Sequence, residues 1–261
     1  MPELVEVERY RSLAEATALG RLIAGVEATD AWYLKRGTEP AGVAAALVGE
    51  TFVAARRRGK LLLLDLSGGG VLGLRFGMSG RLVVDGLAGV DRLLYGPVGE
   101  EARYDRFRVV FADGGVLAVR DPRRLGGVEL NPDEGRLGPD ALTVTLPELR
   151  RALGGAGTAL KARLMDQSRL AGVGNLIADE VLWRAALAPA RPAGDLPGRA
   201  VARLHGHLGP AIAELIERGG SHTGDLMPER RPGGVCPRDG TPLARATVGG
   251  RTTWWCPRHQ R

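Results

Sequence analysis

The chain has 261 residues, of which 44% are hydrophobic and 25% are charged, so it can bury one large core or two modest ones. No apolar run approaches the ~18 residues that cross a bilayer, and the first residues do not resemble a signal peptide. These features argue against a membrane protein or a secreted one, and we expect a cytoplasmic location. The formal net charge of +6 fits a polyanionic partner without identifying one.

The chain opens with Met-Pro-Glu-Leu-Val-Glu-Val-Glu, and we expect a helix over residues 2–20. Proline suits the first position of a helix because its φ is already set and no needed donor is lost. If Met1 is removed, Pro2 has a free secondary amine, which can attack a sugar carbon and become an iminium cation. The positive end of the helix dipole disfavours the protonated amine. Pro2 is therefore our candidate nucleophile.

Two acidic residues follow the proline. Glu3 and Glu6 are three residues apart and share one face of the predicted helix, where a carboxyl group could protonate a leaving oxygen. Helix starts favour proline and acidic residues in any case, so an ordinary helix start is the alternative.

The remaining elements divide into a β-rich half and a helical half. Strands are predicted at 22–28, 51–66, 71–76, 81–85, 107–111 and 116–120, with a hairpin turn at Asp113-Gly114-Gly115. Helices are predicted at 147–153, 159–167, 176–186 and 201–218. Short strands with glycine-rich turns indicate a β-sandwich. The fold class is α+β, with a domain boundary near 138–146.

A glycine-rich turn joins two of the predicted helices within residues 164–180. One helix ends near Gln167, the chain turns through Gly172 and Gly174, and the next helix begins near Asn175. Backbone amides at such a helix start bind phosphate. An ordinary helical hairpin is the alternative interpretation.

Two short knuckles near the end of the chain carry metal-ligand side chains in the spacing Cys-x2-Asp-x16-Cys-x2-His. This spacing predicts one structural zinc ion per chain in a tetrahedral site. Its ligands would be Cys236, Asp239, Cys256 and His259. Because a carboxylate is rare in structural zinc sites, His222 could replace Asp239 as the fourth ligand. A metal-free hairpin packed through Trp254 and Trp255 also remains possible.

These three stretches together resemble the formamidopyrimidine-DNA glycosylase and endonuclease VIII family. The opening resembles the family's Met-Pro-Glu-Leu-Pro-Glu-Val, with Val5 in place of the second proline, and 164–180 resembles its helix-two-turns-helix motif. The tail resembles its four-cysteine finger with two ligands replaced. The resemblance implies a catalytic β-sandwich domain at 1–140, a helix-two-turns-helix domain at 141–222 and a zinc-finger-like hairpin at 223–261.

The resemblance also implies a function, namely a bifunctional DNA glycosylase and abasic-site lyase. Pro2 would attack C1′ of an extruded nucleotide, Glu3 would protonate the opening sugar, and elimination would cleave the strand. The partner would be double-stranded DNA with a damaged base or an abasic site, bound by a monomer.

Further residues receive roles through the same resemblance. Lys60, in the context Arg-Gly-Lys, would contact phosphate near the lesion and could assist proton transfer, whereas a solvated edge strand is the alternative for this basic stretch. Asn175 and Arg251 would grip phosphate, and Arg251 could act as an acid in the second elimination. Loops 76–80 and 121–126 would fill the gap left by the extruded nucleotide, through Met78, Arg123 and Leu125.

Two of these loop residues have a simpler explanation. Leu125 stands where the family generally has phenylalanine, and both Met78 and Leu125 could be minor core residues.

Two alternative functions stay open at this point. One is a lesion-binding or lyase-only member of the family, and the other is an RNA- or ribosome-associated binding protein. Residues 221–235 form a shorter segment than the lesion-capping loop of the formamidopyrimidine branch, so the sequence does not specify a damaged base.

Overall fold

The computed structural model describes residues 2–90, 93 and 101–261. They form two compact units, one of Pro2 with Glu6–Glu134 and one of Glu3–Val5 with Gly135–Arg261. The units divide a few residues before the predicted boundary. Gly138 donates its amide hydrogen to the Gln167 carbonyl at 2.9 Å, so this connecting stretch is already bonded to the second unit.

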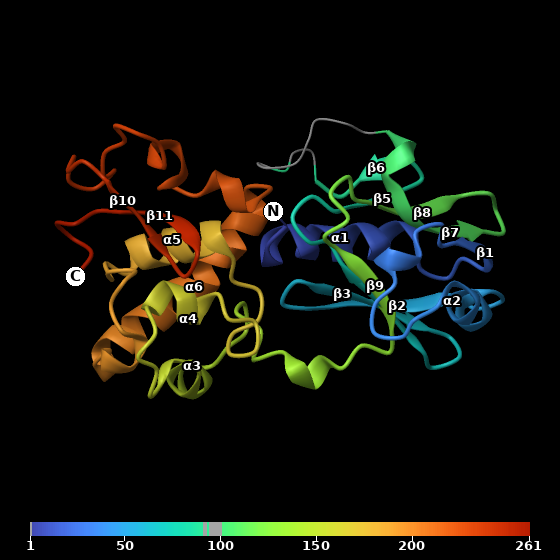
Figure 1. Cartoon of the computed structure of the whole chain (residues 1–261), viewed down its shortest axis with the longest axis horizontal. Helices are drawn as coiled ribbons and strands as arrows, with labels where there is room; N and C mark the ends of the chain where they lie inside the picture. Colours follow the sequence, from blue (N-terminus) through green and yellow to red (C-terminus); the bar gives the residue numbers. More distant parts are fainter. Residues whose placement is uncertain (1, 91–92, 94–100) are drawn as a thin grey trace. The chain divides into compact units, whose positions relative to one another are not determined.

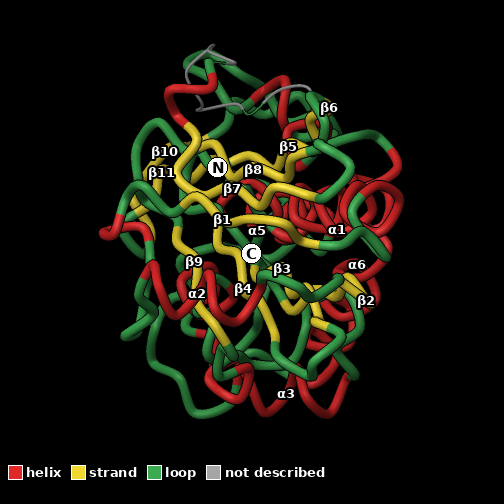
Figure 2. The backbone as a smooth tube through the Cα atoms, turned by 90° about the vertical axis from the view of Figure 1, so that its right-hand side faces the viewer, coloured by secondary structure: helices red, strands yellow, loops and turns green. Residues whose placement is uncertain are grey.

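The first unit contains two antiparallel sheets (Figure 1), which confirm the predicted β-sandwich. The larger sheet has the order β1 (Ile23–Glu27), β7 (Asp105–Phe111), β8 (Val116–Arg120), β5 (Arg81–Val84) and β6 (Leu87–Ala88). The smaller has the order β2 (Phe52–Arg58), β3 (Leu61–Leu66), β4 (Val71–Arg75) and β9 (Gly127–Leu130). Figure 2 shows these strands in yellow.

Hydrophobic alternation explains how these strands build a shared core. In β7, Phe107, Val109 and Phe111 are buried while their neighbours are partly exposed, as expected for a strand with one face in the core. The helix α1 (Leu4–Thr17) contributes Val7 and Tyr10 to the same core. The predicted first helix is therefore confirmed, although it begins two residues later than expected.

Some elements of this unit escaped the sequence prediction. These are the helix α2 (Pro40–Leu47), the strands β6 and β9 and the short 3-10 helix η1 (Ala31–Tyr33). The prediction of one strand over 51–66 is wrong, because a turn at Gly59 and Lys60 divides this stretch into β2 and β3. The helix α2 is short and rich in alanine, and only Val43 and Leu47 bury fully, so its hydrophobic period is weak.

The second unit is helical, as predicted, and ends in a β-hairpin. Its elements are α3 (Leu146–Leu153), α4 (Leu160–Leu164), α5 (Asn175–Arg184), α6 (Gly198–Glu217), β10 (Ala244–Val248) and β11 (Arg251–Trp255). Its 3-10 turns are η4 (Ala193–Asp195), η5 (Ser221–Thr223) and η6 (Met227–Glu229), whereas η2 (Ala102–Tyr104) lies in the first unit and η3 (Glu134–Arg136) starts at the last residue of that unit. Every residue of α5 between its first and last is buried, which makes it the central helix of this unit. Among the described residues, no helix is both long and apolar enough to span a membrane.

Candidate functional site

The carboxylate of Glu3 is bound at the amino end of α5. Its Oε1 accepts the Leu176 amide hydrogen at 2.9 Å, and its Oε2 accepts the Ile177 amide hydrogen at 3.1 Å. Glu3 is only 1% exposed. The first amides of a helix have no partner within the helix, and the dipole favours a negative charge there. Glu3 therefore supplies both the hydrogen bonds and the charge that this helix start requires.

The glycine-rich turn before α5 allows this close approach. A Cβ on Gly174 would lie 2.2 Å from Cδ of Glu3, and a Cβ on Gly172 would lie 2.4 Å from Cδ1 of Leu4. The Leu4 amide also donates to the Gly172 carbonyl at 3.1 Å. We expected these helix-start amides to bind DNA phosphate, and for Leu176 and Ile177 that expectation is wrong, because Glu3 already accepts their hydrogens.

The two other acidic and nucleophilic residues of the amino end belong to the first unit. Pro2 is buried, and Glu6 on α1 is 2% exposed. Burial, and after it the charge of Glu6, raises the pKa of Tyr10 well above its usual value. The Tyr10 hydroxyl therefore stays protonated, and it donates a hydrogen bond to the Gly80 carbonyl at 3.1 Å.

The basic stretch of β2 ends in the turn that carries Lys60. Lys60 is half-buried and follows Gly59, whose φ of +59° lies in the left-handed region that glycine tolerates. The neighbouring arginines are held in place: Arg57 pairs with Glu8 at 2.8 Å, and Arg56 pairs with Asp65 at 2.7 Å. The strand β2 is an edge strand, as the solvated-edge alternative supposed, but these two arginines are ordered by carboxylates.

The loops 76–80 and 121–126 lie together in the first unit. Asp121 is fully buried, and its carboxylate accepts the Ser79 hydroxyl at 2.5 Å and the Gly126 amide at 2.8 Å. A Cβ on Gly77 would lie 2.3 Å from the Leu125 carbonyl carbon, so the two loops touch. Nothing in the sequence indicates the role of Asp121, because its partner Ser79 lies in another loop.

The tips of these loops differ in exposure. Leu125 is 51% exposed, which excludes the minor-core explanation for that residue, whereas Met78 is half-buried. Arg123 is exposed, and its side chain makes no ion pair within the part of the chain that the structure describes. The loop 121–126 thus presents an exposed apolar side chain and an exposed cation two residues apart.

Asn175 and Arg251, our two further phosphate candidates, both lie in the second unit. Asn175 is the first residue of α5, and its Oδ1 is buried without a hydrogen-bond partner among the described residues. Arg251 is exposed at the start of β11, directly after the turn at Gly249 and Gly250, whose φ values are +58° and +72°. These glycines allow the tight turn that presents Arg251.

A buried lysine anchors the hairpin that carries Arg251. Lys161 is 0% exposed, and its ammonium group lies 2.7 Å from Oδ1 of Asp179. It also donates to the Thr252 carbonyl at 3.2 Å and to the Thr253 hydroxyl at 2.8 Å. Burial lowers the pKa of Lys161, and the Asp179 carboxylate opposes that effect. A charge-assisted contact therefore ties β11 to α4 and α5.

Asp179 holds a second cation with its other oxygen. Oδ2 accepts Nη2 of Arg230 at 2.7 Å and the Trp254 amide at 3.4 Å. Buried charges of this kind need partners, and Asp179 has one on each oxygen. The sequence patterns assigned no role to Asp179, Lys161 or Arg230, because each has its partners in another element. The one local indication of a buried charge was that Asp179 and Glu180 lie between apolar residues in the middle of α5.

Four side chains near the chain's end form a cluster that could hold a metal ion. The ligand atoms of Cys236, Asp239, Cys256 and His259 all lie within 4.8 Å of one another. The bond from Thr241 lowers the pKa of Asp239 to about 2, so this group is an ionised oxygen donor at neutral pH. Within the described part of the chain, His222 does not belong to this cluster.

The helix α5 orients this cluster. The indole N–H of Trp183 donates to Sγ of Cys236 at 3.4 Å, and Nε2 of His259 lies 3.0 Å from the Trp183 carbonyl. When Nε2 of His259 donates its hydrogen to the carbonyl, Nδ1 carries the lone pair that can bind a metal ion. This Nδ1 lies 3.4 Å from Sγ of Cys236. The imidazole is thus turned toward the other three ligands.

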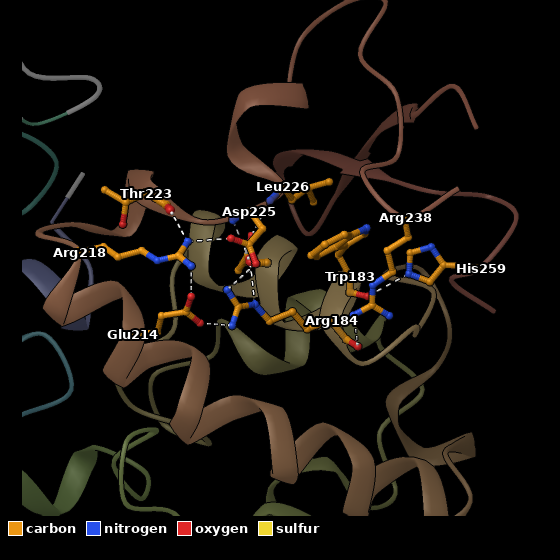
Figure 3. Close-up of polar contacts among 10 residues, drawn as sticks. Trp183, Arg184, Glu214, Arg218, Thr223, Asp225, Leu226, Arg238 and His259 are labelled. Atoms are coloured by element: carbon orange, nitrogen blue, oxygen red, sulfur yellow. Dashed lines mark hydrogen bonds and ion pairs between the residues drawn. The ribbon is translucent and has the colours of Figure 1, made fainter. Parts of the chain in front are cut away.

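Ion pairs fasten the segment before the cluster. Glu180 accepts the amides of Asp225 and Leu226 at 3.1 and 2.9 Å. Figure 3 shows Arg184 and Arg218 facing the carboxylates of Glu214 and Asp225, and Arg184 lies 3.0 Å from Asp225. The short segment after α6 is thereby bonded to α5.

Comparisons with known proteins place these features in context. The family model for the formamidopyrimidine-DNA glycosylase N-terminal domain matches residues 1–128. The family model for the formamidopyrimidine-DNA glycosylase H2TH domain matches residues 137–226. The formamidopyrimidine-DNA glycosylase of Halorhodospira halophila is 35% identical over 282 residues, and that of Cereibacter sphaeroides is 37% identical over 290 residues. Both alignments cover 100% of this chain and 100% of the relative.

Solved structures agree over the same length. A complex between the Lactococcus lactis Fpg and an abasic site containing DNA is similar with a TM-score of 0.84 and 25% identity. A Lactococcus lactis Fpg mutant in complex with a Fapy-dG containing DNA is similar with a TM-score of 0.85 and 26% identity. In both cases 100% of each chain is covered.

The close approach of Glu3 to the glycine-rich turn leads to a testable prediction. Gly174 has φ −119° and ψ −162°, which alanine adopts without strain, so Gly174→Ala changes only the space available to Glu3. We expect the clash to lower the free energy of unfolding by about 1 to 3 kcal/mol, measured by urea denaturation.

Gly206→Ala is the matched control, because no atom lies within 4 Å of its added Cβ and it sits in the middle of α6. Here alanine should raise stability by up to ~1 kcal/mol. A Gly174→Ala protein as stable as the parent would show that the turn does not need glycine.

Proposed function

Because the chain belongs to the formamidopyrimidine-DNA glycosylase family, we propose that it excises damaged bases from double-stranded DNA through the free amine of Pro2 and then nicks the strand. The observation that carries this proposal is the anchoring of Glu3, whose carboxylate accepts two amide hydrogens at the start of α5. A chain terminus is ordinarily poorly ordered. Anchoring the residue next to Pro2 gives the terminal amine a defined position, as a nucleophile requires.

The proposed chemistry begins with the Pro2 nitrogen. It forms a bond to C1′ of an extruded nucleotide, and the glycosidic bond breaks so that the base leaves with the bonding electron pair and takes up a proton. We assign to Glu3, whose carboxylate is anchored next to Pro2 in the sequence, the role of the acid that protonates the sugar ring oxygen as the ring opens.

The iminium that results supports strand cleavage. It acidifies the hydrogen on C2′, and loss of that proton expels the 3′ phosphate with the electrons of its C–O bond. Water then hydrolyses the iminium and regenerates the amine. Glu6 is the second carboxylate that we assign to this chemistry, because it is buried on α1 one turn after Glu3.

The DNA contacts that we propose follow from exposure and charge. Lys60, Asn175 and Arg251 bind phosphates, with the charge and exposure of Arg251 as the supporting observation. We also assign to Arg251 the role of acid in a second elimination, which would follow the loss of the 3′ phosphate. The touching loops 76–80 and 121–126 fill the gap left by the extruded nucleotide, through Met78, Arg123 and Leu125.

We further propose that the carboxy-terminal cluster binds one zinc ion. A tetrahedral zinc ion with bonds of about 2.0 to 2.3 Å separates its ligand atoms by roughly 3.3 to 3.8 Å. Cys236 Sγ lies 3.4 Å from His259 Nδ1, and Cys256 Sγ lies 3.5 Å from Asp239 Oδ2, so the donor set fits. The metal would be structural, since all four ligands come from the protein.

The whole-chain matches favour this enzyme over an RNA-binding protein. Duplexes that carry either a damaged base or a preformed abasic site separate a full glycosylase from a lyase-only member. A full glycosylase releases the free base and cleaves both duplexes, whereas a lyase-only member cleaves only the second.

The first functional prediction concerns the amine. Borohydride should reduce the iminium and trap a covalent complex with abasic DNA, visible by denaturing electrophoresis. Pro2→Gly, or retention of Met1, should reduce trapping by at least roughly tenfold, because the secondary amine is lost or blocked. Undiminished trapping with Met1 retained would remove Pro2 as the nucleophile.

The second functional prediction concerns the phosphate contacts. The logarithm of the binding constant should fall with the logarithm of salt concentration by about 0.9 per neutralised phosphate, and Arg251→Ala should reduce that slope by about one. Arg199→Ala removes an equal charge from an exposed position on α6 and serves as the control. A loss of affinity confined to one lesion would instead identify Arg251 as a base-reading residue.

The third functional prediction concerns the metal. Elemental analysis of protein purified without chelator should give one zinc per chain, and Cys256→Ala should abolish it. Zinc removal should loosen the hairpin that carries Arg251 and weaken DNA binding while α1 stays folded. A zinc-free protein with full activity would show that Trp254 and Lys161 hold the hairpin without metal.

A further inference from the structure

One large aromatic side chain of the first unit has no place in the core. Trp32, in η1, is 67% exposed, more than any other large hydrophobic side chain among the described residues. Its neighbour Tyr33 is fully buried, so the 3-10 turn holds one aromatic ring inside and presents the other to solvent. Tryptophan is enriched among the few residues that supply most of the binding energy at interfaces.

The segment around Trp32 is fastened to loop 121–126. Asp30 pairs with Arg124 at 2.6 Å, and the Tyr33 hydroxyl donates to Asp121 at 3.3 Å. Burial, and after it the charge of Asp121, raises the pKa of Tyr33, so this hydroxyl keeps its proton. Trp32 lies between these two anchors in the sequence. It is therefore held beside the loop whose tip is Leu125.

The surroundings of Trp32 are cationic. The Lys35 ammonium group lies 4.4 Å from the centroid of the Trp32 ring and donates to the Trp32 carbonyl at 2.6 Å. The exposed Arg123 belongs to the adjacent loop. An aromatic ring with cations beside it is the combination with which proteins bind an unpaired base and the neighbouring phosphates.

We propose that Trp32 stacks on the base that loses its partner when the damaged nucleotide leaves the helix. The inference rests on the proposed gap-filling role of loop 121–126. Leu125 at the loop tip is apolar but cannot stack as an aromatic ring does, and Trp32 supplies a ring next to it. Lys35 binds a phosphate beside that base, while Arg123 keeps its place in the gap.

The test compares two duplexes that carry a tetrahydrofuran abasic analogue. In one the analogue faces a cytosine, and in the other it faces a second tetrahydrofuran, so that no base is left to stack. Trp32→Ala should weaken binding of the first duplex by about tenfold, within the range for the loss of one stacking contact. It should leave binding of the second duplex within about twofold of the parent protein, and Trp32→Phe should restore most of the first affinity.

Two control variants separate the possible failures. Val53→Ala removes another exposed apolar side chain, 57% exposed on β2, and should leave the affinity for both duplexes unchanged. If Leu125→Ala weakens binding and Trp32→Ala does not, the stacking role of Trp32 is wrong while the loop assignment stands. If neither variant changes affinity, DNA does not bind at this loop. Equal losses on both duplexes would mean that Trp32 contacts the backbone and not the base.

Discussion

The hydrogen bonds between the Glu3 carboxylate and the first amides of α5 are the constraint on which the candidate site depends. The nucleophile that we propose, Pro2, needs an ordered position, and two charge-assisted bonds hold the residue next to it. The same bonds satisfy amides that α5 could not satisfy alone. Gly172 and Gly174 follow from this arrangement, because side chains there would collide with Leu4 and Glu3.

The helix α5 serves the rest of its unit in a similar way. Asp179 holds Lys161 and Arg230 and accepts the Trp254 amide, while Trp183 packs against the metal-ligand cluster. Lone buried charges would destabilise this helix, and here each has an opposite charge in contact. One buried helix thus positions the amino end, the hairpin and the cluster.

Local sequence patterns predicted the features that depend on neighbouring residues. The opening proline and acids, the glycines before Asn175 and the spacing of Cys236 and Cys256 each indicated their structural context. The alternating strands were found near the expected positions, except that the single strand predicted over 51–66 is the hairpin of β2 and β3. The patterns also predicted a helix start that binds an anion. The expected anion was a DNA phosphate, whereas the structure has the Glu3 carboxylate there. Glu3 lies far from Leu176 in the sequence, and nothing local connects the two residues.

The remaining misses have the same origin. Asp121 organises two loops through partners about forty and ninety residues away, and Lys161 contacts a hairpin about ninety residues away. A single sequence shows a charged residue and not its distant partner, so both resembled surface charges. The sequence assigned no role to Trp32, and only the packed structure reveals its exposure.

The central claim is that the anchored amino end carries the nucleophile, and peptide mapping tests it most directly. The protein is reduced with borohydride during reaction with abasic DNA, digested with nuclease and protease, and sequenced by mass spectrometry. The account predicts a deoxyribose-derived mass on the peptide that begins at Pro2, located on the proline nitrogen. The same mass on Lys60 or Lys161, with an unmodified Pro2 peptide, would contradict it.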